Sequence, residues 1–272
     1  MAAHPPDLPP AYNGRVEPPR FYCPQLASRE VALDPAEAQH ALRSLRLRPG
    51  DALTLFDGRG RVARAVLKAD PPSASGSNSA SMGRPPRRRP PRAVAMIESI
   101  SELPPPQPAL TLIVAACKGP RLDWLMEKCT ELGIARLVLA EFVHSVVHVR
   151  PQHLSKLRRI TIEACKQCGR AWLPELEAGI ELAAAARAAA ARGELFIADP
   201  ADTAPRLGCR LAQHRPNFGH VAVVIGPEGG IAPEELALLA DVGGQPVRLA
   251  KNILRVETAC LAVAAVWADL AC

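Results

Sequence analysis

The sequence predicts an α/β protein in which a small β-barrel precedes a larger domain built on a parallel sheet. Apolar strands alternate with helical segments after residue 108, which is typical of a parallel sheet covered on both faces. Before residue 104 the strands are short and separated by Pro-Gly and Asp-Gly turns, which favours a barrel. With 272 residues, 48% of them hydrophobic, the chain is long enough to bury a core in each domain.

The first domain is expected at residues 20–104, after a Pro-rich flexible tail at residues 1–19. Its expected elements are one helical segment, DPAEAQHALRSLRL, and three strands, DALTLFDG, RVARAVLKA and RAVAMIESI. A low-complexity insertion at residues 70–92 interrupts the strands and is expected to be disordered. Its arginine run, RPPRRRPPR, is either a solvated loop or a contact for RNA phosphates.

The segment LPPPQP at 103–108 predicts a stiff linker, so the second domain is expected at 108–272. Its expected strands are LTLIVAAC, ARLVLAEF, ELFIAD, VAVVI and PVRLA. Its expected helices are RLDWLMEKCTELG, LSKLRRITIEACKQCG, IELAAAARAAAAR, PEELALLA and VETACLAVAAVWADL.

The charge and hydrophobicity of the sequence indicate which partners and which location to expect. The formal net charge of +6 agrees with a nucleic-acid partner but is weak evidence, because the run at 84–92 supplies five of the arginines. No apolar stretch reaches the roughly 20 residues that cross a bilayer, and the first twenty residues lack the apolar segment of a signal peptide. We therefore expect a cytoplasmic protein with no membrane contact.

The eight cysteines include a single C-x-x-C pair, Cys165 and Cys168. Together with His144 and His148 this pair could form a zinc site. The alternative is two thiols one turn apart on an amphipathic helix, since no second C-x-x-C completes a zinc ribbon. We expect reduced thiols and no metal.

The glycine-rich turn lies in VAVVIGPEGGIAPEELALLA, between a strand and a helix. Phosphate cradles need consecutive backbone N–H donors, but Pro227 lacks one and Glu228 adds negative charge. A ligand without phosphate and with a positive centre, such as S-adenosylmethionine, fits this turn better than a dinucleotide does. The alternative is a tight turn that only starts the helix at Pro233.

A second polar loop lies in PVRLAKNILRVETACLAVAAVW, where Arg255, Glu257 and Thr258 stand at the start of a helix. Buried helices rarely begin with charged residues aimed at a neighbouring loop, although exposed helix caps often do.

With GPEGG, the Pro-Glu-Glu helix start and ILRVETA, the sequence resembles the RsmE family of ribosomal RNA methyltransferases in the SPOUT superfamily. The resemblance runs from about Arg20 to Leu270 and is corroborated by RFYCP, HALRSLRLRPGD, LFDGRG, KGPRLDWLMEKCTELG and EACKQCGR. It implies a PUA-like RNA-binding barrel and a C-terminal S-adenosylmethionine-binding domain with a trefoil knot. It also implies a homodimer that methylates N3 of one uridine in the 16S rRNA of the small ribosomal subunit.

The resemblance also implies the site residues. The cofactor-binding set is Ile225, Gly226, Pro227, Gly229, Leu249, Asn252, Ile253 and Leu254. The RNA-binding set is Arg20, His40, Arg43, Arg46, Lys118, Arg170 and Lys251. The catalytic residues are Arg255 and Glu257.

Three positions depart from the family pattern. Ala250, Lys251 and Asn252 replace the usual Gly-Pro-Arg before Ile253, so the missing cation falls to Lys251. Ala232 stands where a serine often caps the next helix, a loss of about 1 kcal/mol of helix stability. His144 and His148 occupy places where relatives carry basic residues, which favours weak RNA contacts over metal binding.

For the reaction we expect Arg255 to hold the uracil oxygens, since a guanidinium donates two hydrogen bonds to one face. Glu257 or Glu228 would accept the imide proton, although Glu257 could equally complement a helix dipole. Glu131 and Glu163 either orient Arg170 or face solvent.

Two other functions stay open. One is a 2′-O-ribose methyltransferase of the same superfamily, against which Pro227 argues because those relatives tend to read G-N-E-G. The other is a non-catalytic RNA-binding protein, which only the altered loop at Ala250 to Asn252 favours.

Overall fold

The computed structural model describes residues 17–26, 29–68, 92–201, 203–214 and 219–271. Nearly all of the expected tail at 1–19 and insertion at 70–92 lies outside the described residues. The chain divides into two compact units, one of residues 1–55 and 63–100, the other of residues 56–62 and 101–272. Each unit is described by itself.

The first unit is a five-stranded sheet with the strand order β1-β3-β4-β5-β2. Its elements are β1 (Arg20–Tyr22), β2 (Glu30–Ala32), α1 (Pro35–Gln39), the π-helical turn η1 (His40–Ser44), β3 (Ala52–Phe56), β4 (Arg61–Lys68) and β5 (Val94–Glu102). Alternate residues of β3 and β4, such as Leu53, Leu55, Ala63 and Ala65, form the core, as a sheet with one covered face requires. The sequence did not predict β1 and β2, because three residues are too few for a periodic pattern.

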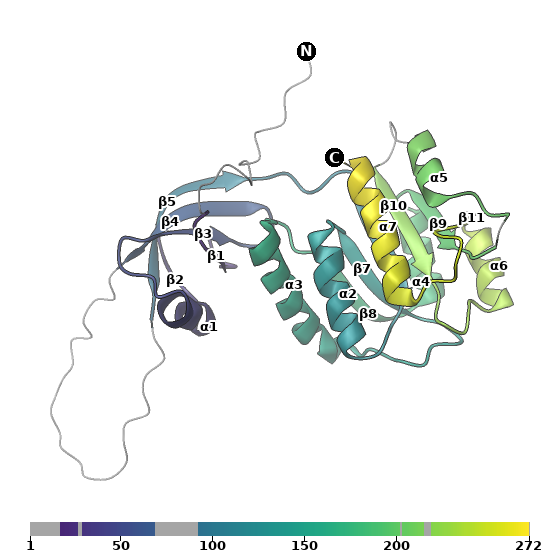
Figure 1. The fold of residues 1–272 in the computed structure, drawn as a ribbon, viewed down its shortest axis with the longest axis horizontal. Coiled ribbons are helices and arrows are strands. Elements are labelled where there is room, and N and C mark those ends of the chain that lie inside the picture. The colour runs from purple at the N-terminus through teal and green to yellow at the C-terminus, as the bar shows by residue number, and fades with distance from the viewer. Residues whose placement is uncertain (1–16, 27–28, 69–91, 202, 215–218, 272) are drawn as a thin grey trace, which may run out of the picture. The chain divides into compact units, whose positions relative to one another are not determined.

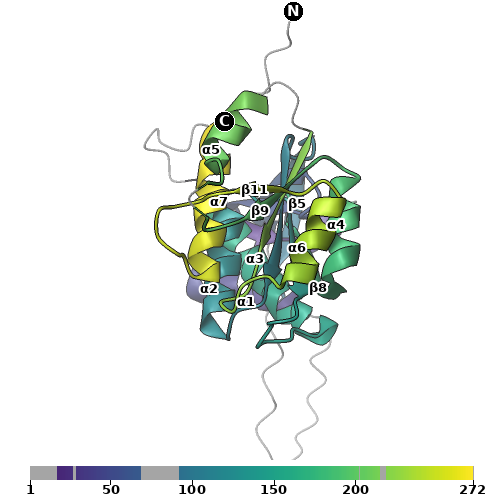
Figure 2. The same cartoon turned by 90° about the vertical axis from the view of Figure 1, so that its right-hand side faces the viewer.

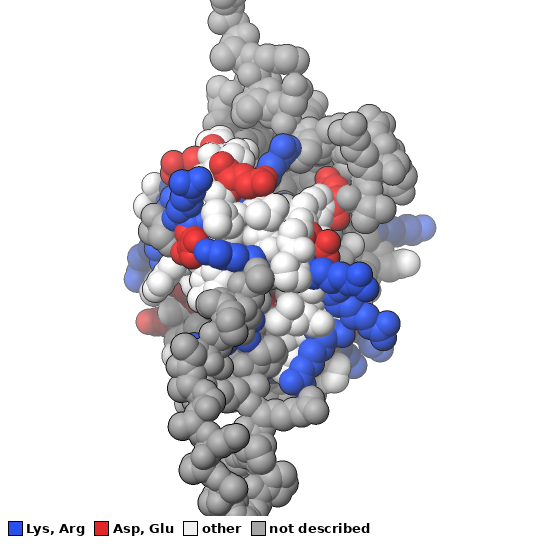
Figure 3. Space-filling model, turned by 90° about the vertical axis from the view of Figure 1, so that its left-hand side faces the viewer, with Lys and Arg blue, Asp and Glu red and all other residues white. Residues whose placement is uncertain are grey.

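The π-helical turn η1 carries two of the basic residues expected to bind RNA, His40 and Arg43. Arg46, just beyond it, has a left-handed backbone with φ 56°, which is uncommon for a residue with a Cβ. Arg43, Arg46 and Arg48 are all exposed. In Figure 3, Lys and Arg side chains lie on both sides of the visible face and are most densely grouped at its lower right.

The second unit is a six-stranded parallel sheet with helices on both faces, as the sequence predicts. Its strand order is β11-β9-β10-β6-β7-β8. The strands are β6 (Ala109–Ala115), β7 (Arg136–Glu141), β8 (Glu175–Glu181), β9 (Glu194–Ala198), β10 (His220–Ile225) and β11 (Gln245–Val247). The helices are α2 (Pro120–Glu131), α3 (Leu154–Cys168), α4 (Leu182–Ala190), α5 (Leu207–His214), α6 (Pro233–Asp241) and α7 (Val256–Ala271), with a short 3₁₀ turn η2 (Pro151–His153) before α3.

The helices form two layers around this sheet (Figures 1 and 2). Helices α2, α5 and α7 cover one face, and their apolar residues pack on Leu110, Leu112 and Val114 of the central strand β6. Helices α4 and α6 cover the opposite face, where Ile113 and Ala115 of the same strand point. Successive β6 residues therefore enter opposite cores, which explains the unbroken apolar run of this strand.

Two elements of the second unit differ from the sequence prediction. Residues Glu175–Glu181 form the edge strand β8, although the sequence shows no apolar run there. An edge strand has one unpaired side and tolerates charged residues. Its sequence, ELEAGIE, therefore lacks the continuous apolar run by which the buried strands of this sheet were predicted. Helix α5 was also not predicted, because its eight residues are fewer than three turns.

The last segment of the chain passes close to the segment before α5. Arg248 N donates to Pro205 O at 2.8 Å, and Leu207 N donates to Arg248 O at 3.1 Å. The chain then leaves the α6 face and ends in α7 on the opposite face. The trefoil knot that the resemblance implies for this segment stays a prediction. No helix among the described residues is long and apolar enough to cross a membrane.

Candidate cofactor and catalytic site

The glycine-rich turn connects the carboxyl end of β10 to α6 and is tightly closed. Gly230 N donates to Pro227 O at 2.9 Å, which closes a turn over Glu228 and Gly229. Gly226 has no room for a side chain, because a Cβ there would lie 2.4 Å from Ile231 Cγ1. The carboxyl ends of parallel strands are where open α/β sheets bind ligands. The turn therefore has the position and the tight backbone of a ligand loop.

Glu235 ties this turn to the loop after β7. Its carboxylate accepts hydrogen bonds from Ala232 N at 2.9 Å and from Val143 N at 2.8 Å. The first bond supplies half of a capping box, so Glu235 partly replaces the side-chain cap that Ala232 lacks. In the same loop His144 Nδ1 lies 3.2 Å from Gly230 O. Two loops far apart in the sequence are thus held together beside the candidate site.

Glu257 is a buried carboxylate with one unpartnered oxygen. It lies at the second position of α7, and only 10% of its side chain is exposed. Its Oε1 lies 3.6 Å from Arg121 Nε at the start of α2, whereas Oε2 is buried without a hydrogen-bond partner among the residues that the structure describes. Buried carboxylate oxygens are normally hydrogen-bonded, so Oε2 is suited to a donor that the protein itself does not provide.

The thiol of Cys117 marks where three loops converge. Burial raises its pKa to about 11, and the negative charges of Glu257 and Glu228 contribute in the same direction, while Arg121 opposes them. The geometry agrees: β6 and β10 are neighbouring parallel strands whose carboxyl ends lie side by side, with Ile225 paired to Val114, and α7 packs against both strands. Neither Cys117 nor Arg121 was predicted as a site residue, although Cys117 directly precedes the quoted motif KGPRLDWLMEKCTELG and Arg121 lies within it.

The second predicted loop, from Leu249 to Arg255, is more exposed. Leu249 and Leu254 are half-buried and pack against the core, whereas Lys251, Asn252 and Ile253 are exposed. The exposed Arg255 precedes α7, and its carbonyl accepts the backbone N–H of Ala259 at 2.8 Å. Within the described residues its guanidinium makes no hydrogen bond or ion pair, so its donors are free for a ligand.

Of the residues expected to bind RNA, Lys118 lies exposed in the loop after β6, beside Cys117. Arg170 is placed differently: its guanidinium donates to Thr130 O at 2.8 Å and Ile134 O at 2.9 Å. These carbonyls lie at the end of α2 and in the following turn, so Arg170 stabilises a helix C-terminus. Burial also lowers the pKa of Arg170. Its role as an RNA contact stays a prediction, as do those of Arg20, His40, Arg43 and Arg46 in the first unit.

The zinc alternative gains no geometric support. Cys165 is buried, with its Sγ 3.8 Å from Trp172 O. His148 pairs instead with Glu141, and His144 with Gly230. Across the described ranges, no three His, Cys, Asp or Glu side chains gather in a way that could hold a metal ion.

Comparisons with known proteins agree with this architecture. Residues 104–268 match the family model for an RNA methyltransferase domain, and residues 33–75 match that for an RNA methyltransferase PUA domain. The ribosomal RNA small subunit methyltransferase E of Mycobacterium tuberculosis is 31% identical over 236 residues, covering 84% of this chain and 82% of that protein. The enzyme of the same name from Synechocystis is 30% identical over 239 residues, covering 86% of this chain and 71% of that protein.

Solved structures are similar over nearly the whole chain. The ribosomal RNA small subunit methyltransferase E from Neisseria gonorrhoeae, bound to S-adenosylmethionine, has a TM-score of 0.76 and 29% identity, covering 93% of this chain and 98% of that one. A Legionella pneumophila structure in complex with the same cofactor has a TM-score of 0.75 and 27% identity, covering 92% and 97%. The fold prediction of a SPOUT-type α/β domain with a PUA-like domain is confirmed. The family model over most of the chain and the relatives above 30% identity show that this protein belongs to the RsmE family of ribosomal RNA methyltransferases.

Proposed function

We propose that this protein methylates N3 of a specific uridine in the 16S rRNA of the small ribosomal subunit, with S-adenosylmethionine as the methyl donor. The observation that carries the proposal is Glu257 Oε2, which is buried in the first turn of α7 and has no hydrogen-bond partner among the described residues. The relatives' shared name and the S-adenosylmethionine in two similar structures support it.

The two loops fit the cofactor. Pro227 is buried and Glu228 exposed, an arrangement that suits a ligand with a positive centre rather than a phosphate. The residues that would hold it are Ile225, Gly226, Pro227 and Gly229 in the first loop and Leu249, Asn252, Ile253 and Leu254 in the second. When bound, S-adenosylmethionine supplies an electrophilic methyl group on a sulfonium centre.

The protein's own residues then have to orient the uracil and remove its proton. Glu257 Oε2 accepts the imide proton of N3, a role that its missing hydrogen-bond partner leaves open. Arg121 stays beside Oε1 and keeps the carboxylate oriented. Arg255 donates to the uracil oxygens, where negative charge develops as the proton leaves. Lys118 and Lys251, both exposed, supply positive charge for the RNA backbone.

We also propose that the protein acts as a homodimer in the cytoplasm, where its ribosomal substrate lies. Three large apolar side chains are unusually exposed on two loops of the second unit: Val143 (61%), Val146 (74%) and Ile253 (86%). A second copy of the chain that covers these two loops would remove this apolar surface from water.

The test is nucleoside mass spectrometry on small subunits from a strain that lacks this protein, before and after treatment with purified protein and isotopically labelled S-adenosylmethionine. Labelled N3-methyluridine is the expected product. A labelled 2′-O-methyl nucleoside would instead favour the ribose methyltransferase. Cofactor-free protein that binds RNA without any product would favour the non-catalytic alternative.

A further inference from the structure

A second cavity lies at the amino ends of the strands, at the opposite edge of the sheet from the cofactor loops. It encloses about 460 Å³, and its lining includes Thr111, Arg136, Trp172, Arg192 and His220. Thr111 and Arg136 lie at the start of β6 and β7, His220 opens β10, and Arg192 follows α4. Strands of about six residues span roughly 20 Å. The cavity is therefore separate from the site after β10, and neither the cofactor nor the methyl transfer accounts for it.

The register of the sheet brings these polar side chains onto one face. Thr111 pairs with Arg136 across β6 and β7, and His220 pairs with Ala109, two residues before Thr111. Residues paired in this way point to the same side of the sheet. Thr111 Oγ1 lies 2.8 Å from His220 Nε2. Two residues further along each strand, Ile113, Val138 and Ala222 belong to the apolar core beneath α4. The polar side chains therefore lie at the edge of that core, on the same face of the sheet.

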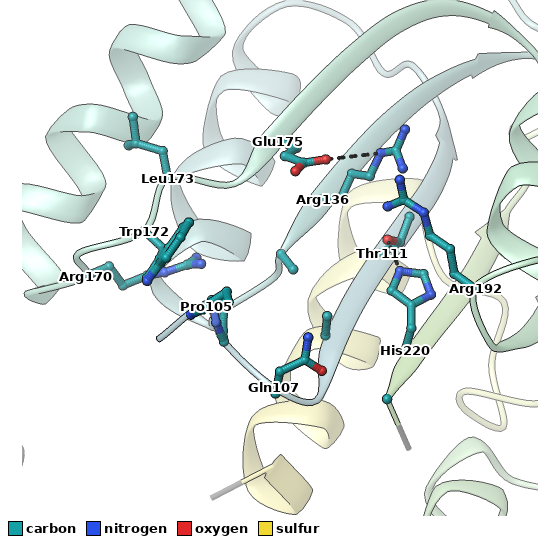
Figure 4. Close-up of a pocket in the computed structure, with 14 residues that line it drawn as sticks. Pro105, Gln107, Thr111, Arg136, Arg170, Trp172, Leu173, Glu175, Arg192 and His220 are labelled. Atoms are coloured by element: carbon teal, nitrogen blue, oxygen red, sulfur yellow. Dashed lines mark hydrogen bonds and ion pairs between the residues drawn. The ribbon is translucent and has the colours of Figure 1, made fainter. Parts of the chain in front are cut away.

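The charges in the cavity are mostly positive. Figure 4 shows the guanidinium groups of Arg136 and Arg192 near each other, above Thr111 and His220. Arg136 pairs with Glu177, and its Nε lies 3.8 Å from Glu175, whose side chain is 71% exposed. Within the described residues Arg192 has no carboxylate partner. The charge of Arg136 is therefore balanced by carboxylates, whereas Arg192 leaves an uncompensated positive charge on the lining of the cavity.

Two buried nitrogen atoms of this row, Arg136 Nε and His220 Nδ1, have no hydrogen-bond partner among the described residues, although Arg136 Nε still lies within ion-pair distance of Glu175. Burial, together with the charges of Arg192 and Arg136, lowers the pKa of His220. The lowered pKa favours the neutral imidazole of His220, so the positive charge of the cavity comes from its arginines and not from this histidine. Such a row costs stability in the free protein, which an anionic ligand would offset.

Trp172 gives the cavity an aromatic wall opposite Arg136 and Arg192 (Figure 4). Its indole is held in place, because Nε1 donates to Leu103 O at 3.1 Å. Trp172 and Glu175 also line a neighbouring hollow of about 450 Å³ that contains Arg59, Ser155 and Arg158. A fixed aromatic ring between two hollows with arginines matches the surfaces that bind single-stranded nucleic acid, where bases stack and phosphates meet cations.

We propose that this cavity binds a nucleotide of single-stranded RNA, with its phosphate against Arg136 and Arg192 and its base against Trp172. The neighbouring hollow then receives the next nucleotide along the strand. The choice of RNA over a free mononucleotide rests on the proposed function and on this second hollow, whereas the nucleotide-binding chemistry rests on the cavity alone.

The test measures binding of 5′-uridine monophosphate and of a single-stranded hexauridylate to the full-length protein at two salt concentrations. Arg192→Glu reverses a charge in the cavity, and Arg187→Glu, on an exposed position of α4 that does not line it, is the matched control. Arg192→Glu should weaken hexauridylate binding about tenfold and lower the salt slope by about 1, while Arg187→Glu changes the affinity less than twofold. Affinity for S-adenosylmethionine should stay at the parental value in both variants.

Tryptophan fluorescence locates the base. Hexauridylate should quench the parent, and Trp172→Phe should remove most of the quenching while Trp124 and Trp267 continue to emit. Equal Arg192-dependent affinities for the mononucleotide and the hexamer would overturn the RNA assignment. Unchanged binding of both probes by Arg192→Glu would overturn the proposal altogether. Arg192-dependent hexamer binding by a protein that methylates no subunits would refute the proposed function and leave the cavity assignment standing.

Discussion

Glu257 Oε1 lies 3.6 Å from Arg121 Nε, while its other oxygen is buried and has no hydrogen-bond partner in the described part of the chain. Arg121 is half exposed, so this pair alone adds little stability. Its effect is to orient the carboxylate, with one oxygen beside Arg121 and the other left without a hydrogen-bond partner among the described residues.

Glu257→Gln should lower the single-turnover rate of small-subunit methylation by about 10² or more, because an amide cannot accept the imide proton. Glu234→Gln is the matched control, since Glu234 holds the same second position in the first turn of α6 but is exposed. Each change should reduce stability by about 0.3–1 kcal/mol through the helix dipole. Equal, near-parental rates for the two variants would leave Glu257 with the dipole role only.

Arg255→Ala should reduce the single-turnover rate by about 10²–10³ on saturating subunits while S-adenosylmethionine binds as in the parent. Arg255→Lys should also be impaired, since lysine keeps the charge but loses the paired donors. Arg187→Ala serves as the control for loss of one exposed arginine. A near-parental rate for Arg255→Ala would remove this residue from the mechanism and direct attention to Lys251.

Gly60→Ala should destabilise the second unit far more than Gly133→Ala. Both glycines have a left-handed backbone, with φ +96° and +88°, so each alanine carries about 1–2 kcal/mol of backbone strain. A Cβ at Gly60 would also lie 2.5 Å from Leu103 O and 2.7 Å from Trp172 Cε2, whereas one at Gly133 would meet nothing within 4 Å. The crowding adds about 1–3 kcal/mol.

Urea unfolding followed by tryptophan fluorescence measures this difference, because the 3 tryptophans all lie in the second unit. Equal losses for the two alanine variants would mean that the contact of Gly60 with Trp172 does not hold in solution.

The stability of the second unit should fall as the pH drops below about 6.5, the ordinary pKa of histidine. Because His220 has a lowered pKa in the folded protein, the unfolded chain binds the proton more readily, and stability is lost on the acidic side. His220→Gln keeps a polar partner for Thr111 but does not titrate. Urea unfolding at pH 7.5 and 5.5 should show a smaller loss in this variant, and an identical loss would contradict the lowered pKa.

Iodoacetamide at pH 8 should modify the exposed Cys209 first and the half-buried Cys168 next. Cys117, Cys129 and Cys260 should react only after unfolding, because burial raises their pKa values, to about 11 for Cys117 and about 12 for Cys129. Peptide mass spectrometry gives the order. Cys168 that reacts only after a chelator is added would revive the zinc alternative.

Periodicity located most helices of the second unit because each buries one face and spans several turns. It missed β8 and α5, where the elements are at an edge or too short to show a period. The site was predicted from the motifs rather than from periodicity: GPEGG and ILRVETA indicated both loops. Arg170 shows the limit of that inference, since its side chain contacts the carbonyls of Thr130 and Ile134.

By itself the sequence determined the α/β class, the family and the two loops of the candidate cofactor site, because each of these depends on residues that are close together in the sequence. Only the tertiary structure decided that Arg121 faces Glu257, that Glu235 holds Val143, and that Thr111, Arg136 and His220 share one end of the sheet. The physical reason is that a parallel sheet brings the ends of strands together in an order unlike that of the sequence. Contacts at those ends depend on strand order and register, which no local pattern of residues specifies.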